Sequence, residues 1–379
     1  MTIRTHSAER HADRDGLDSA RVLIVDDSVV VRAVIARLID ASHRFSVVGA
    51  VGNVAAALAF LDRATVDFIL LDIEMPGIDG LSALPDLIAA GQGAKVLIVS
   101  SSADEGGATA VRALALGAAE TLTKPSTSAL STRFGLALVN KLEMLCEYPA
   151  QMPPALVVCS PVAPPPLPID KPLPVDKPSP IRPVSTSDDY DIVAIGSSTG
   201  GIHALSQMFG QMPAGFRLPI VITQHLPASF MPYFAAQIAV LAGRPCDVAV
   251  DRMRIRPGRI IIAPGDAHLK AVKLSEGGAA FRLTHEAALS GCMPSVDPML
   301  ASLADVYGAR LLAVVLSGMG RDGADGARRV HDSGGCVVVQ DRQSSVVWGM
   351  PGAIAASGIA DAVLAPDAIG RLAATRRRP

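Results

Sequence analysis

Three polar residues could form a hydrolytic triad, because each follows a different apolar run that is typical of a buried strand. They are Ser198 after residues 192–195, His225 after residues 219–224 and Asp322 after residues 311–316. In such a triad the imidazole takes the serine proton, and the carboxylate fixes the imidazole tautomer and stabilises its cation. If the strands are parallel, these side chains lie along one sheet edge. Gly318 and Gly320 would allow backbone N–H groups near Met319 to approach a developing oxyanion.

Each triad residue also has a simpler explanation. Ser198 lies in a turn before a helical pattern, where a hydroxyl commonly caps the helix. His225 could be a hydrogen-bonded residue at a strand end, and Asp322 could cap a helix that runs from Gly323. His268 also follows a strand and is a competing base. The segment around Ser198 is not a G-x-S-x-G nucleophile elbow, so the pattern alone leaves the triad as a hypothesis.

A second group of polar residues follows the strands expected in the N-terminal third of the chain. They are Asp26 and Asp27 after residues 22–25, Asp72 after 68–71, Ser100 after 96–99 and Lys124 after 120–123. Three carboxylates that meet at one edge repel each other unless a cation lies among them, and oxygen ligands suit Mg²⁺. Lys124 would offer a second positive charge to a phosphoryl group. Turn residues of this kind are common singly, but this succession favours a phosphoryl site.

The elements that must position these residues are parallel strands alternating with helices. Residues 21–146 contain five expected strands and five expected helices, which indicates a parallel, doubly wound α/β domain. The strands are 22–25, 47–51, 68–71, 96–99 and 120–123, and the helices are 29–39, 53–62, 81–90, 105–116 and 128–146. Pro85 is expected to limit or bend the third helix.

Residues 188–379 show a second α/β pattern, which predicts a mostly parallel sheet. The strands are 192–195, 219–224, 259–263, 311–316, 336–340 and 362–364, and the helices are 229–242, 296–307, 324–333 and 353–356. Residues 269–274 and 280–285 flank Glu276-Gly-Gly278. This spacing predicts a hairpin added to the sheet.

The two patterns are separated by a change in composition. Thirteen of the 28 prolines lie between Tyr148 and Ser187 without periodicity. Residues 147–187 are therefore predicted to be a semi-extended Pro-rich linker, and a motif for a proline-recognising partner is the alternative. Residues 1–20 are polar and mixed in charge, unlike a signal peptide, and are predicted to be a flexible N-terminal tail.

The bulk composition argues against several classes of protein. Lys+Arg (34) and Asp+Glu (36) nearly cancel, so nucleic acid is not an expected partner. Five scattered cysteines without CxxC pairs predict reduced thiols in a cytoplasmic protein, with neither a zinc site nor a disulfide framework. No apolar run is long enough to span a bilayer, so direct membrane insertion is not expected. The histidines lack recognisable ligand spacing, which disfavours a metal-dependent hydrolase.

The polar residues of the N-terminal region stand in four short segments, Val-Asp26-Asp27-Ser, Leu-Asp72-Ile-Glu-Met-Pro-Gly-Ile-Asp-Gly80, Val-Ser100-Ser and Thr-Lys124-Pro125. In these segments the region resembles the receiver domain of two-component response regulators. The resemblance implies a flavodoxin-like fold, phosphorylation at Asp72, and Mg²⁺ held by Asp26 and Asp27 with Asp72 and the backbone carbonyl of Glu74. Ser100 would be the switch hydroxyl and Lys124 the phosphate partner. Thr121 departs from the aromatic residue that many receivers carry at that position, so the signal could spread differently.

Six further segments stand at the strand ends and loops of the C-terminal half. They are Ala194-Ile-Gly-Ser-Ser-Thr-Gly-Gly201, Thr223-Gln-His-Leu-Pro227, Ala263-Pro-Gly-Asp-Ala-His-Leu269, Pro294-Ser-Val-Asp297, Leu316-Ser-Gly-Met-Gly-Arg-Asp-Gly-Ala324 and Ser344-Ser-Val-Val-Trp-Gly-Met-Pro351. With these segments, both halves together resemble the chemotaxis protein-glutamate methylesterase (CheB) family. The resemblance implies a triad of Ser198, His225 and Asp322, with the backbone N–H of Met319 and the Thr199 turn facing the oxyanion. It implies hydrolysis of glutamyl methyl esters on methyl-accepting chemotaxis receptors, with release of methanol and no cofactor. Deamidation of certain receptor glutamines is also implied.

The resemblance further implies control by the receiver, which would lie over the catalytic cleft until a chemotaxis histidine kinase phosphorylates Asp72. The expected partners are the receptors and this kinase, and the chain is expected to be a monomer. Arg321 and Met293 depart from the family pattern and could alter which receptor helices are accepted. The alternative is a non-catalytic response regulator whose C-terminal domain binds a partner protein. DNA-binding output is less favoured because no basic recognition helix is apparent.

Overall fold

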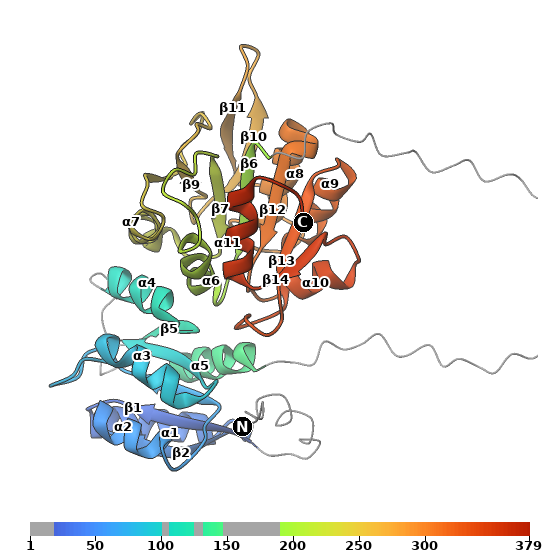
Figure 1. Ribbon diagram of the computed structural model, residues 1–379. Helices are drawn as coiled ribbons and strands as arrows, with labels where there is room; N and C mark the ends of the chain where they lie inside the picture. Colours follow the sequence, from blue (N-terminus) through green and yellow to red (C-terminus); the bar gives the residue numbers. More distant parts are fainter. Residues whose placement is uncertain (1–18, 101–105, 125–131, 147–189) are drawn as a thin grey trace, which may run out of the picture.

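The computed structural model describes residues 19–100, 106–124, 132–146 and 190–379 as two α/β domains that pack against each other (Figure 1). The predicted linker at 147–187 and most of the predicted tail at 1–20 lie outside these residues. Within them, no helix combines the length and the apolar character needed to cross a membrane.

The N-terminal domain is a five-stranded sheet in the order β2-β1-β3-β4-β5, and every neighbouring pair is parallel. The domain begins with β1 (Ala20–Val25), α1 (Val29–Asp40), β2 (Phe45–Val51), α2 (Val54–Leu61) and β3 (Phe68–Leu71). It continues with α3 (Gly80–Gly91), β4 (Lys95–Ser100), α4 (Gly106–Leu116), β5 (Glu120–Thr123) and α5 (Thr132–Leu145). The predicted parallel, doubly wound fold is confirmed.

Polar caps explain where the first three helices of this domain begin. The side chains of Ser28, Asn53 and Asp79 each accept a hydrogen bond from a backbone N–H in the first helical turn. α3 runs through Pro85 instead of ending there. Residue 105 and residues 128–131, which the sequence placed in helices, lie outside the described residues.

The C-terminal domain is a seven-stranded parallel sheet in the order β14-β13-β12-β6-β7-β9-β8. Its strands are β6 (Ile192–Ser197), β7 (Ile220–Gln224), β8 (Cys246–Val248), β9 (Ile260–Ile262), β12 (Leu311–Val315), β13 (Cys336–Gln340) and β14 (Ala362–Leu364). Its helices are α6 (Gly201–Phe209), α7 (Met231–Ala242), α8 (Val296–Tyr307), α9 (Ala324–Asp332), α10 (Met350–Ala356) and α11 (Pro366–Thr375), with short 3₁₀ turns η1 (Ala228–Phe230) and η2 (Gly308–Arg310). The central strands β6, β7, β12 and β13 are fully buried, as expected when helices cover both faces of a parallel sheet.

The predicted hairpin forms, but its predicted addition to the main sheet was wrong. β10 (His268–Lys273) and β11 (Ala279–Thr284) make a separate two-stranded antiparallel sheet, which projects from the domain in Figure 1. The apolar side chains of Leu269, Ala271 and Phe281 lie in the same buried cluster as residues of α8. The hairpin is therefore held by side-chain packing and by backbone hydrogen bonds between β11 and residues 252–255, and not by pairing with an edge of the seven-stranded sheet.

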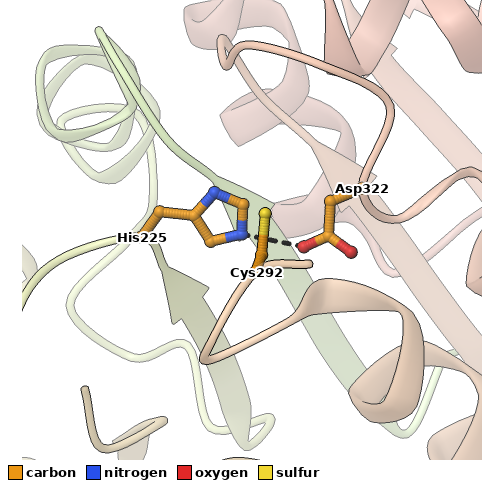
Figure 2. Close-up of side chains that lie close together, drawn as sticks. All are labelled: His225, Cys292 and Asp322. Atoms are coloured by element: carbon orange, nitrogen blue, oxygen red, sulfur yellow. Dashed lines mark hydrogen bonds and ion pairs between the residues drawn. The ribbon is translucent and has the colours of Figure 1, made fainter. Parts of the chain in front are cut away.

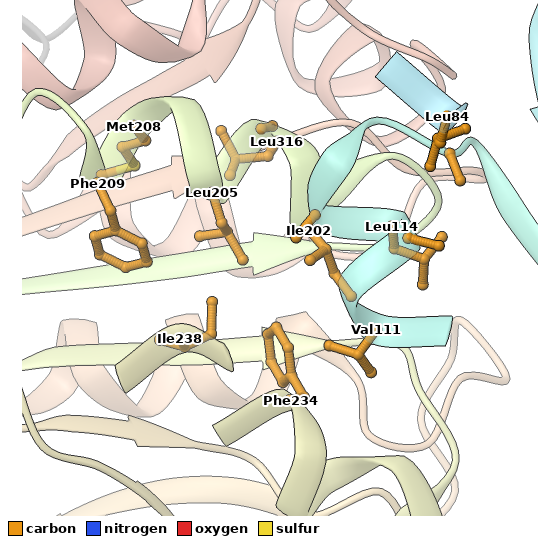
Figure 3. Close-up of a cluster of buried hydrophobic side chains, with 14 of the residues drawn as sticks. Leu84, Val111, Leu114, Ile202, Leu205, Met208, Phe209, Phe234, Ile238 and Leu316 are labelled. Atoms are coloured by element: carbon orange, nitrogen blue, oxygen red, sulfur yellow. The ribbon is translucent and has the colours of Figure 1, made fainter. Parts of the chain in front are cut away.

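A continuous apolar cluster joins the two domains (Figure 3). Val111 and Leu114 on α4 of the N-terminal domain lie beside Ile202 and Leu205 on α6 and Phe234 on α7. All five side chains are at most 6% exposed, so the contact excludes water. Burial of this kind contributes roughly 25 cal/mol per Å² of apolar surface. α4 is therefore a docking element, since it contacts α6, α7 and η1 of the other domain.

Candidate active site

The strands that carry the triad candidates are neighbours in the seven-stranded sheet. β6 lies between β12 and β7, so the chain connections diverge on either side of it. Such a switch point at the carboxyl ends of parallel strands is where α/β domains bind ligands. Ser198 follows β6, His225 follows β7, and Asp322 lies in the loop between β12 and α9. The predicted parallel arrangement of these three strands is confirmed.

Two of the three side chains form a hydrogen-bonded pair (Figure 2). His225 Nε2 lies 2.8 Å from Asp322 Oδ2, and Asp322 is only 2% exposed. Asp322 also accepts hydrogen bonds from Ser295 Oγ at 2.6 Å and from the backbone N–H of Val296 at 2.7 Å. Burial alone would raise the pKa of Asp322, but these three hydrogen bonds hold it below the usual range. The group is therefore a carboxylate at neutral pH.

The pairing with Asp322 assigns the tautomer of His225. A carboxylate only accepts hydrogen bonds, so Nε2 of the neutral ring carries the proton that points at Asp322. Nδ1 is then unprotonated and can accept a proton from a hydroxyl group. The His225 side chain is 17% exposed, so the ring is partly accessible from solvent.

Ser198 lies in the turn between β6 and α6, next to His225 across the strand ends. β6 and β7 pair at Ser197 and Gln224, and the backbone N–H of His225 donates to Ser197 O at 3.1 Å. Gln224 Nε2 donates to Ser198 O at 2.9 Å, which fixes the turn. In the described part of the chain, no hydrogen bond joins the Ser198 hydroxyl to His225. Catalytic hydrogen bonds often tighten only when substrate binds.

The loop after β12 brings further backbone groups to the Ser198 turn. Ser198 N donates to Ser317 O at 3.0 Å, and Gly318 N donates to Val347 O at 3.0 Å. A Cβ at Gly318 would lie 2.9 Å from Ser198 Cβ, so this close approach requires glycine. Among the hydrogen bonds of the described residues, none uses the backbone N–H of Met319 or Thr199. Both N–H groups are available to a ligand.

The capping explanations do not fit the helices that follow Ser198 and Asp322. The N-cap of α6 is Gly200 and the N-cap of α9 is Gly323, and neither helix has a side-chain capping hydrogen bond. The Asp322 carboxylate instead bonds to the backbone N–H of Val296, the first residue of α8. Neither candidate therefore caps its own helix.

His268, the competing base, is not available for proton transfer. It is buried, and its Nε2 lies 2.7 Å from Glu286 O. Its Nδ1 accepts a hydrogen bond from the backbone N–H of Ser295 at 3.0 Å. Because both ring nitrogens are engaged, His268 orders the loop that supplies Ser295 to Asp322.

The predicted acids of the N-terminal domain also meet at one sheet edge. Asp26, Asp27 and Asp72 each offer a carboxylate oxygen, and these oxygens lie within 4.8 Å of one another. Lys124 Nζ lies 2.5 Å from Asp26 Oδ2 and 2.7 Å from Asp72 Oδ2. Burial raises the pKa of Asp72, and the hydrogen bond and charge of Lys124 oppose that rise. Ser100 ends β4 at the same edge, where its carbonyl accepts from Lys124 N at 2.7 Å.

These residues fit Mg²⁺, which prefers carboxylate and carbonyl oxygens and keeps several waters. Asp26 and Asp72 are buried, whereas Asp27 is exposed and can reach a hydrated ion. The Glu74 side chain is exposed, and its backbone N–H donates to Asp72 Oδ1 at 3.2 Å. The loop after β3 therefore keeps the Glu74 backbone beside the acid cluster.

A hydrogen bond connects the N-terminal domain directly to the Ser198 turn. Thr199 Oγ1 donates to Glu120 Oε2 of β5 at 3.1 Å. Glu120 is also ion-paired with Lys141 at 3.2 Å. On the same side, His203 Nδ1 of α6 lies 3.2 Å from the carbonyl oxygen of Ala115 on α4. The residue next to Ser198 is thus engaged by the other domain.

Comparisons with known proteins match both domains. The sequence model of CheB methylesterase matches residues 193–372, and that of the response regulator receiver domain matches residues 22–133. A protein-glutamate methylesterase/protein-glutamine glutaminase 1 of Paramagnetospirillum magneticum is 43% identical over 361 residues, which cover 92% of this chain and 93% of that protein. The chain belongs to the CheB methylesterase family.

Other CheB relatives match over similar lengths. A protein of the same description from Rhodospirillum rubrum is 41% identical over 378 residues, 96% of each chain. A relative from Rhodospirillum centenum, described as the methylesterase/glutaminase of group 2 operon, is 38% identical over 370 residues, 94% of this chain and 93% of that one. The predicted family is confirmed, and the chain is a hydrolase of the CheB type with a response-regulator receiver domain.

The structure places three further residues beside the triad candidates or the Ser198 turn, which the sequence did not indicate. Ser295 lies within the quoted segment Pro294-Ser-Val-Asp297, but its bond to Asp322 depends on a loop path that periodicity does not reveal. In the sequence Cys292 is one of five scattered thiols and Glu120 is a residue of an expected strand, and neither position indicates a contact with the triad candidates. Thr121 is half-buried on β5, and Met293 and Arg321 are exposed, so their effects on signalling and receptor choice stay predictions.

Proposed function

We propose that this chain removes methyl groups from glutamyl methyl esters of chemotaxis receptors, releasing methanol, and also deamidates certain receptor glutamines. The observation that carries the proposal is the His225–Asp322 hydrogen bond of 2.8 Å beside the Ser198 turn. A base with a fixed tautomer, a neighbouring hydroxyl and available backbone N–H groups are the parts that acyl transfer needs. Receptor demethylation of this kind would mediate sensory adaptation.

The mechanism proceeds through an acyl-enzyme. Ser198 Oγ attacks the ester carbonyl while its proton passes to Nδ1 of His225, and the Asp322 carboxylate stabilises the resulting imidazolium. The backbone N–H groups of Met319 and Thr199 donate to the oxyanion. The imidazolium then gives its proton to the departing methoxide, so methanol leaves. Water, activated by the same imidazole, hydrolyses the acyl-enzyme and restores glutamate; with a glutamine substrate, ammonia leaves in place of methanol.

Control of this reaction is assigned to the receiver. Asp72 accepts a phosphoryl group from a chemotaxis histidine kinase, with Lys124 and Ser100 contacting the phosphoryl oxygens. Asp26, Asp27, Asp72 and the Glu74 carbonyl would hold Mg²⁺, which would supply positive charge to the phosphoryl group. The contact between Glu120 and Thr199, together with the apolar packing of α4, supports an unphosphorylated state in which the Ser198 turn is restrained. Phosphorylation activates by favouring the undocked arrangement.

The proposal also includes the domain boundaries, the cellular location and the oligomeric state of the chain. We assign residues 21–146 to the receiver, 147–187 to a linker and 188–379 to the catalytic domain, after a tail at 1–20. The chain acts in the cytoplasm as a monomer on the cytoplasmic parts of methylated receptors. It does not act on nucleic acid.

Asp72→Asn tests the control step. The amide cannot be phosphorylated, yet it keeps the size of the carboxyl group and an oxygen for Lys124. We expect basal methanol release to remain, while stimulation by a small-molecule phosphodonor, about 5–150-fold for a typical coupling energy, is lost. The measurement is methanol release from methylated receptor membranes with and without the phosphodonor.

Asp79→Asn is the matched control, because it removes an exposed carboxyl group from the same loop. Asp79 caps α3, and asparagine is an equally good N-cap. This variant should keep its stimulation. Full stimulation of the Asp72→Asn chain would contradict the assignment of Asp72 as the phosphoacceptor.

A further inference from the structure

Three side chains that could bind a metal ion, through nitrogen, sulfur and oxygen, lie together beside Ser198. A ring nitrogen of His225, the sulfur of Cys292 and a carboxylate oxygen of Asp322 lie within 4.8 Å of one another. Figure 2 shows the Cys292 thiol between the imidazole and the carboxylate in that view. Cys292 lies in the segment between β11 and α8, so three separate loops supply the three ligand atoms. We propose that these residues bind Zn²⁺ and that bound zinc inhibits the esterase.

The chemical nature of the three ligands favours zinc over magnesium or calcium. Hard cations such as Mg²⁺ and Ca²⁺ take oxygen ligands, whereas a combination of imidazole, thiolate and carboxylate suits Zn²⁺. Three protein ligands leave one tetrahedral position for water. The receiver acids offer only oxygen, so the two clusters in the described residues favour different ions.

The observed distances require only a small adjustment. Tetrahedral zinc with Zn–N and Zn–O bonds of about 2.1 Å places the nitrogen and oxygen about 3.4 Å apart. His225 Nε2 and Asp322 Oδ2 lie 2.8 Å apart, so they must separate by roughly 0.6 Å for a metal to enter. Asp322 stays oriented by Ser295 and Val296, which act as outer partners of the ligand. The partly exposed His225 ring is the group that moves.

Zinc inhibits the esterase because it changes which ring nitrogen of His225 carries the proton. This step rests on the proposed function, in which His225 is the base. When zinc binds Nε2 of neutral His225, the ring proton moves from Nε2 to Nδ1. The thiol proton of Cys292 is released to solvent, because the metal ligand is the thiolate. Nδ1 then already carries a proton and cannot accept the one from Ser198. Zinc therefore blocks the base without contacting the nucleophile.

Binding is tested first without any need for activity. Co²⁺, which takes zinc sites, is added to the full Ser198→Ala chain under reducing conditions with saturating Mg²⁺ to fill the receiver site. We expect the ultraviolet charge-transfer absorption of a thiolate–cobalt bond, which added Zn²⁺ abolishes. The band should disappear when Cys292→Ala or the nearly isosteric Cys292→Ser is added. It should persist with Cys246→Ala, a cysteine on β8 outside the cluster.

Inhibition is tested by methanol release at buffered free Zn²⁺, with each variant compared with its own activity in chelator. Cys292→Ala should raise the half-inhibitory zinc concentration by at least about tenfold, and Cys246→Ala should not change it. A missing thiolate–cobalt band in the Ser198→Ala chain, or equal zinc inhibition with and without Cys292, would overturn the proposal. A cobalt–thiolate band in the Ser198→Ala chain, combined with no methanol release by the parent chain in chelator, would instead overturn the proposed function and leave the metal site standing.

Discussion

Replacing Ser198 by alanine is expected to lower methanol release from methylated receptors by at least about 10⁴-fold, because the acyl-enzyme can no longer form. His225 would retain its bond to Asp322, so the fold and the base remain in place. The measurement is methanol release per chain at saturating phosphodonor, which removes restraint by the receiver from the comparison. Phosphorylation of Asp72 should be unchanged, since it takes place in the other domain.

Ser197→Ala is the matched control in the same turn. The Ser197 hydroxyl is buried and donates to Gln224 Oε1 at 2.6 Å, so it does not face the base. Removal of this hydroxyl leaves Gln224 Oε1 unpaired, which lowers the free energy of unfolding by about 1–3 kcal/mol. Methanol release should stay within about tenfold of that of the parent chain. Methanol release that persists in pure Ser198→Ala protein would show that another group is the nucleophile.

Replacing Gly107 by leucine is expected to activate the unphosphorylated chain. Gly107 lies on α4, and a Cβ there would come 2.6 Å from ring carbon Cε2 of Tyr233 on α7. Tyr233 is 39% exposed and its ring can shift, so the cost lies at the lower end of the roughly 1–3 kcal/mol that overpacking causes, and about 1.4 kcal/mol changes an equilibrium tenfold. Because the cost falls on the docked arrangement, basal methanol release should rise about tenfold, and stimulation by the phosphodonor should shrink.

Ala108→Leu separates this effect from a general change in α4. Ala108 is the next residue of the same helix and is exposed, so leucine there meets solvent and not α7. Its basal activity should equal that of the parent chain. A second check adds Tyr233→Ala to Gly107→Leu, which removes the ring that the leucine meets and should lower basal release again. Equal basal rates for all of these chains would mean that α4 docking does not restrain the enzyme.

The fold was largely predictable because its strands are short, buried and separated by helical patterns. β3 and β5 have the predicted bounds, and the three strand ends that carry the triad candidates are neighbours as expected. The short β8 and the helix α11 were missed. β8 has only three residues, too few to show the alternation of a strand in the sequence. It is an edge strand, and it is recognised only by its pairing with β9.

The site was predictable only in part, because strand order fixes where a residue lies and not which groups its side chain contacts. The order of β12, β6 and β7 places Asp322 and His225 near Ser198. The bonds from Ser295 to Asp322 and from Thr199 to Glu120 span 27 and 79 residues. Such contacts depend on loop paths and on docking between domains, which local sequence patterns do not encode.

The proposed function is tested most directly by methanol release from methylated chemotaxis receptors, measured with the full chain in the presence and absence of a phosphodonor. We expect a basal release that depends on Ser198 and rises when Asp72 is phosphorylated. Absence of methanol in both conditions, from a chain that still binds receptors and accepts phosphate, would contradict the proposed function and favour a response regulator that acts by binding alone.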